Sequence, residues 1–125
     1  MITLLRSVGV LYIASGLWCA FQLELATNFL GFYQLTGKGA GEFFSVYGGL
    51  QVGIGVAMVL SSLRENYREA SIYFSAIFST SLVVFRFGSF VLYEGLESFA
   101  FMAVLELLIA FILWKIWFGT RTRKS

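Results

Sequence analysis

The sequence predicts an all-α integral membrane protein in which residues 1–125 form one domain, a bundle of four transmembrane helices. Three observations predict this fold. Hydrophobic residues make up 58% of the chain and its mean hydropathy is +0.81, which is more apolar surface than a soluble domain of this length can bury. Four apolar stretches are long enough to cross a hydrocarbon core of roughly 30 Å, which takes about 20 helical residues. Proline is absent, so no helix has an obligatory kink.

The four predicted spans are joined by connections of different character. The spans are 4–23, 42–62, 71–93 and 96–117. Residues 63–70, "LRENYREA", read as a short charged turn, and residues 93–97, "YEGLE", as a tight turn that contains glycine. The first connection, 24–41, is longer and carries apolar residues such as Phe29 and Phe32. A freely solvated loop rarely carries so many, so we expect this segment to lie in the membrane interface or to dip back into the bundle.

The distribution of lysine and arginine predicts that both termini are cytoplasmic. One side of the membrane carries Arg6, Arg64, Arg68, Lys115, Arg121, Arg123 and Lys124, and the other side carries Lys38. Cytoplasmic loops and ends hold an excess of basic residues in membrane proteins. The sequence therefore predicts a multi-pass protein of the plasma membrane in which residues 37–41 face outside.

Both ends of the chain have a competing interpretation. Residues 1–20 could be a cleaved signal peptide, but the bulky Trp18 precedes Cys19, which fits a small-residue cleavage site poorly. We therefore expect the first span to remain uncleaved as a transmembrane helix of the protein. The basic tail "RTRKS" reads as a stop signal beside anionic headgroups rather than as a nucleic-acid patch. Membrane lipids are expected partners, and nucleic acid is not.

Four glycines fall within "YGGLQVGIG", residues 47–55 of the second span. Taken at every fourth position, this span shows a stripe of small residues, Ser45, Gly49, Gly53 and Ala57. Residues four apart share a helix face, and small side chains let helix backbones approach closely in lipid. The stripe therefore predicts a helix-packing surface, with the first span as one candidate partner. The partner helix could belong to the same chain or to a second copy, and Gly48 and Gly55 could serve another contact.

Two ionisable residues lie inside predicted spans, Arg86 in "VVFRFGS" and Glu106 in "VLELLIA". Such groups are costly in a bilayer unless they are paired, hydrated or neutralised. At about 1.5 Å per residue they lie roughly 10 and 15 Å below the outer ends of their helices, a difference that an arginine side chain can bridge. The sequence therefore predicts an ion pair.

Further polar residues of the second span, Gln51, Tyr47 and Glu42, fall in the same outer half. Together with the ion pair they could form a polar cluster or an outward-facing pocket, in which Arg86 would hold an anionic head bidentately and Glu106 would position the guanidinium. The alternative is a pair that fixes the helix register and binds nothing.

The pattern resembles an uncharacterised bacterial family of small four-helix membrane proteins, a domain of unknown function. Its second helix carries a glutamate, four residues, and then Tyr-Gly-Gly-Leu-x-x-Gly-x-Gly. Here the matching residues are Glu42, Tyr47, Gly48, Gly49, Leu50, Gly53 and Gly55, with Arg86 and Glu106 in the later helices. Phe44 stands where the family has arginine, and Gln51 where glutamate is usual. The resemblance implies the four-helix fold, the polar cluster and a bacterial membrane, and it implies no activity.

Three functions stay open on the sequence alone. The favoured one is a non-enzymatic accessory or assembly module, in a homo-oligomer or a larger membrane complex. The second is a binder or transporter of a small amphipathic or anionic molecule. The third is a lipid- or quinone-modifying enzyme, which we do not favour because the chain has no histidine and a single cysteine, Cys19. No catalytic residue, cofactor or metal is expected.

Overall fold

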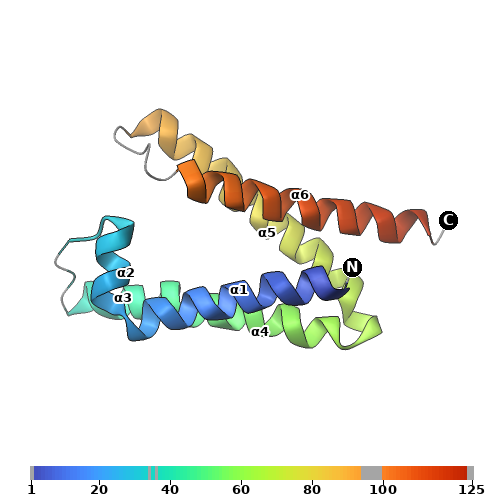
Figure 1. The fold of residues 1–125 in the computed structure, drawn as a ribbon, viewed down its shortest axis with the longest axis horizontal. Coiled ribbons are helices and arrows are strands. Elements are labelled where there is room, and N and C mark those ends of the chain that lie inside the picture. Colours follow the sequence, from blue (N-terminus) through green and yellow to red (C-terminus); the bar gives the residue numbers. More distant parts are fainter. Residues whose placement is uncertain (1, 34, 36, 94–99, 124–125) are drawn as a thin grey trace. The chain divides into compact units, whose positions relative to one another are not determined.

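A computed structural model of the chain describes residues 2–33, 35, 37–93 and 100–123, and every regular element among them is helical. The elements are α1 (Ile2–Phe21), α2 (Leu23–Leu30), α3 (Lys38–Phe43), the π-helix η1 (Phe44–Leu50), α4 (Gln51–Ser62), α5 (Glu65–Leu92) and α6 (Ala100–Thr122) (Figure 1). Because α3, η1 and α4 run on without a break, four long helices result. All four are long and apolar enough to cross a membrane, which confirms the four predicted apolar helices.

The helices extend beyond the predicted spans at several ends. The third helix begins at Glu65 and the fourth ends at Thr122. The spans were predicted from apolar residues alone, whereas a helix can continue into the polar residues on either side. The charged turn predicted over 63–70 is therefore wrong for most of its length. Residues 65–70 form the start of α5, where Glu65 suits the positive end of the helix dipole. Of the turn predicted over 93–97, residues 94–97 lie outside the described residues.

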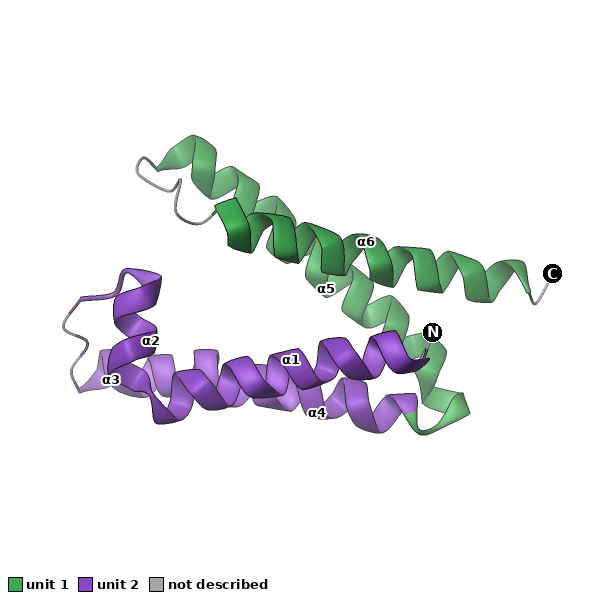
Figure 2. Ribbon diagram, in the orientation of Figure 1, with its two compact units in different colours: residues 1, 63–125 green, residues 2–62 purple. Residues whose placement is uncertain are grey.

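The chain divides into two compact units, coloured separately in Figure 2. Unit 2 is Ile2–Ser62, and unit 1 comprises Met1 and Leu63–Ser125. Within unit 2, α1 packs along α4 and η1; within unit 1, α5 packs along α6. Each unit is thus built on two long helices that lie side by side. That both units join in a single four-helix domain stays a prediction.

The first connection contains the short helix α2, which packs onto the end of its own hairpin. Its buried Ala26 lies in an apolar cluster with Cys19 of α1 and Phe43 of α3. The helix ends at Leu30 and is capped by Gly31, whose φ of +83° lies in the left-handed region that favours glycine. The apolar residues predicted for an interfacial or re-entrant segment thus serve, in part, to cover this cluster.

The helix face that packs against α1 differs from the predicted stripe. A Cβ added to Gly16 would lie 2.7 Å from the carbonyl oxygen of Gly48, and one added to Gly9 would lie 2.9 Å from that of Gly55. These two glycine pairs bring the antiparallel backbones of α1 and the Lys38–Ser62 helix into direct contact. The stripe itself is exposed within the described structure, at Ser45, Gly49, Gly53 and Ala57, and a Cβ at Gly49 or Gly53 meets nothing within 4 Å. The first span as partner of the stripe is therefore wrong.

Helix geometry explains why a stripe of small residues spaced four apart predicted the wrong packing face. Each residue turns an α-helix by about 100°, so a step of four drifts by about 40° and a string of such steps winds around the helix. A step of seven drifts by only about 20°. Gly9 and Gly16 of α1 are seven apart and therefore share one face, and Gly48 and Gly55, which meet them, are also seven apart. This heptad spacing is the pattern of helices that pack at a shallow crossing angle.

Candidate functional site

The ion pair predicted between α5 and α6 is present. The Arg86 Nη2 atom donates to Glu106 Oε1 at 2.7 Å, and its Nε atom donates to Glu106 Oε2 at 2.9 Å. The two parallel hydrogen bonds match the guanidinium fork to the carboxylate, the strongest geometry available to this pair of groups. The Glu106 side chain is 10% exposed and that of Arg86 is 27% exposed.

The sequence around each partner explains how the pair forms. Arg86 and Glu106 lie on helices that run antiparallel, so residues at matched depths meet. Ser89 of α5 donates its hydroxyl to the carbonyl oxygen of Arg86 at 2.6 Å, which satisfies a polar side chain within the helix itself. Small residues occur near the acid, where Ala103 and Ala110 of α6 are buried. The carboxylate is thus held where the two helices pack.

The other predicted site residues belong to unit 2, whereas the ion pair belongs to unit 1, and each group is described within its own unit. Tyr47 stacks on Phe43 with ring centroids 4.7 Å apart and meets Phe32 edge-to-face at 5.7 Å. Glu42 is exposed and Gln51 is half-buried. Tyr47 therefore belongs to an aromatic cluster and packs against Cys19, Ala26 and Phe43. A pocket that these residues share with the ion pair stays a prediction.

An aromatic cluster of unit 1, which lies at the end of the hairpin away from the ion pair, was missed by the sequence analysis. Trp117 stacks on Tyr73 of α5 with ring centroids 5.0 Å apart, and Arg121 lies over the Trp117 ring at 4.6 Å. Trp114 donates its indole N–H to the Thr80 hydroxyl at 2.7 Å. The spacing of Trp114, Trp117 and Arg121 at i, i+3 and i+7 places them on one helix face, and this spacing was the available signal.

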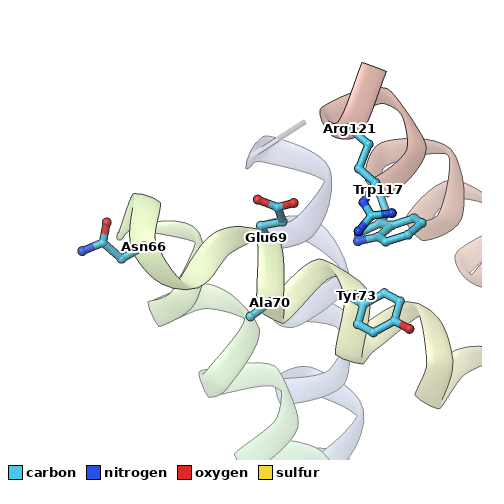
Figure 3. Close-up of a pocket in the computed structure, with 6 residues that line it drawn as sticks. All are labelled: Asn66, Glu69, Ala70, Tyr73, Trp117 and Arg121. Carbon is cyan, nitrogen blue, oxygen red and sulfur yellow. The ribbon is translucent and has the colours of Figure 1, made fainter. Parts of the chain in front are cut away.

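This cluster borders an open pocket of about 520 Å³ within unit 1. The lining residues are Asn66, Glu69, Ala70 and Tyr73 of α5 with Trp117 and Arg121 of α6 (Figure 3). Figure 3 shows the Glu69 carboxylate on one side and the Arg121 guanidinium, resting on the Trp117 ring, on the other. Both charge signs and two aromatic residues thus border one space.

Metal ligation has no candidate in the part of the chain that the structure describes, since no three His, Cys, Asp or Glu side chains there could hold an ion together. No family model, curated protein or solved structure matches this chain. The family resemblance based on the glycine run therefore stays a prediction.

Proposed function

We propose that this chain is a multi-pass protein of the bacterial inner membrane that acts as a non-enzymatic accessory or assembly module. The observation that carries the proposal is the closed Arg86–Glu106 fork, in which both carboxylate oxygens accept from one guanidinium. A pair closed in this way fixes the register of α5 against α6. Separating the two groups in a low-dielectric setting would leave an uncompensated charge, which is strongly unfavourable and therefore holds the two helices in one register.

The membrane setting is supported by what the helices expose. Large apolar side chains stand at the surface of both hairpins, among them Phe21 at 78%, Phe85 at 77% and Val91 at 86% exposure. Each fully buried side chain of this kind gains about 1.5–3 kcal/mol by leaving water, so the exposed set would be unfavourable in an aqueous solvent. Lipid tails cover such surfaces without a protein partner.

The orientation gives the first test. In a Cys19→Ala background, we expect a membrane-impermeant thiol reagent to label Gly41→Cys in intact cells. Nothing lies within 4 Å of a Cβ at this position, so the thiol is accessible. The predicted outer side of the membrane carries a single basic residue, Lys38. Ser125→Cys should be labelled only after the membrane is opened. The opposite pattern would reverse the proposed topology, and loss of the protein from carbonate-washed membranes would exclude the membrane setting altogether.

A binding function is the second candidate, favoured by the 27% exposure of the Arg86 side chain. Thermal unfolding of the detergent-solubilised protein distinguishes it from the module. A ligand at about 100 times its Kd stabilises a protein by about 2.7 kcal/mol. The module predicts that decanoate, an amphipathic anion, shifts the unfolding of wild type and of the Arg86→Met/Glu106→Gln variant equally. A shift that only the wild type shows would favour binding at the pair.

A further inference from the structure

We propose that the pocket between the start of α5 and the end of α6 binds the headgroup of a zwitterionic phospholipid that carries a phosphate and a primary amine. This inference rests on the proposed membrane setting. The pocket, at about 520 Å³, falls within the range of roughly 300–1,000 Å³ typical of small-molecule sites. It lies about 20 Å along α5 from the ion pair, as 13 residues separate Tyr73 from Arg86 at about 1.5 Å each, so the two sites are distinct.

The charges of the pocket match both halves of such a headgroup. The Arg121 guanidinium presents a planar set of donors that suits phosphate oxygens. The Glu69 carboxylate lies across the pocket on α5 (Figure 3). An ionised carboxylate only accepts hydrogen bonds, and an ammonium group only donates them, so the two groups are complementary. A phosphate alone would gain nothing from Glu69, and an amine alone would gain nothing from Arg121. The presence of both signs favours a ligand that carries both.

The aromatic rings add a surface for the rest of the lipid. Tyr73 and Trp117, which both line the pocket, are stacked on each other at 5.0 Å with an interplanar angle of 28°, so each ring holds the other in place. Trp117 already holds a cation, since Arg121 lies 4.6 Å from its ring centroid. Tryptophan and tyrosine concentrate at the level of lipid headgroups, which is the depth that the ends of two membrane-long helices would reach.

The test measures binding of soluble short-chain lipids to the detergent-solubilised protein. Dihexanoylphosphatidylethanolamine supplies phosphate and amine, dihexanoylphosphatidylglycerol supplies phosphate only, and inorganic phosphate represents the free ion. We expect the ethanolamine lipid to bind wild type at least tenfold more tightly than the glycerol lipid, and free phosphate to bind most weakly. Equal affinity for the two lipids would overturn the zwitterionic assignment, and equal affinity for free phosphate would overturn the lipid one.

Three variants locate the site. Arg121→Gln should weaken both lipids about tenfold, whereas Glu69→Gln should weaken only the ethanolamine lipid. Arg123→Gln is the matched control, because it removes the same charge from the same tail at a position that does not line the pocket. An equal effect of Arg123→Gln would show diffuse attraction to a basic tail and overturn the proposal. Carbonate extraction of each variant tests the membrane setting separately, so failure of lipid binding leaves that result standing.

Discussion

Replacing Arg86 with methionine should lower the free energy of unfolding of the detergent-solubilised protein by about 3–5 kcal/mol, the range for breaking a buried pair. The change leaves the Glu106 carboxylate, 10% exposed, without the guanidinium that donates to both of its oxygens. Because the Arg86 side chain is 27% exposed, entry of water places the expected loss at the lower end of that range. Glu106→Gln should be milder, since glutamine stays neutral and polar.

The double variant Arg86→Met/Glu106→Gln should recover part of this loss, because no lone charge remains. Lys115→Met serves as the control. It removes an exposed cation from α6 and should change stability by no more than about 0.5 kcal/mol. Unfolding monitored by circular dichroism against temperature or denaturant compares the four variants with the wild type. If the double variant loses as much stability as the two single variants together, the two residues are not energetically coupled and the prediction is contradicted.

Substitution of Gly55 should be the most damaging change in unit 2. A Cβ at this position would collide with the carbonyl oxygen of Gly9 and would lie 2.8 Å from the backbone nitrogen of Ile13. Backbone atoms cannot swing aside as a side chain end can, so the helices must separate along their length. We expect Gly55→Ala to destabilise the protein by about 1–3 kcal/mol, the usual cost of overpacking, and Gly55→Leu by more.

Gly53 is the matched control because it lies two residues away in the same helix, and nothing stands within 4 Å of an added Cβ. Alanine there removes the backbone entropy of glycine and should stabilise the helix by about 0.5–1 kcal/mol. The two substitutions should therefore have opposite signs in one unfolding assay. A loss of stability at Gly53 as well would show that another helix covers the stripe of Ser45, Gly49, Gly53 and Ala57.

Hydropathy was enough to predict the number of long helices, since a run of about 20 apolar residues leaves few alternatives. The ion pair was also predictable. Ionisable residues are rare within membrane spans and are usually paired, and Arg86 and Glu106 lie at comparable depths on helices that are adjacent in sequence. The packing face of the second span was not. It depends on rotation of the helix, and the π-helix η1 changes that rotation within residues 44–50.

The pocket was missed for a different reason. From the sequence, Glu69 was assigned to a charged turn over 63–70 and Arg121 was counted only among the basic residues of the cytoplasmic side. Their position across one space follows from the pairing of α5 with α6, and Tyr73 stacked on Trp117 sets that pairing at this end. Side-chain partners between two helices depend on their relative axial shift, which composition and hydropathy leave undetermined.

The antiparallel arrangement within each unit also determines which backbone charges the pocket meets. Each helix carries about half an elementary positive charge at its first turn and half a negative charge at its last. In unit 1 the first turns of α5 stand beside the last turns of α6, as the contact of Tyr73 with Trp117 shows. The two partial charges oppose each other there and largely cancel. The charge that this end of the hairpin presents to a ligand is therefore set by side chains, Glu69 and Arg121 of the pocket among them, and not by the helix backbones.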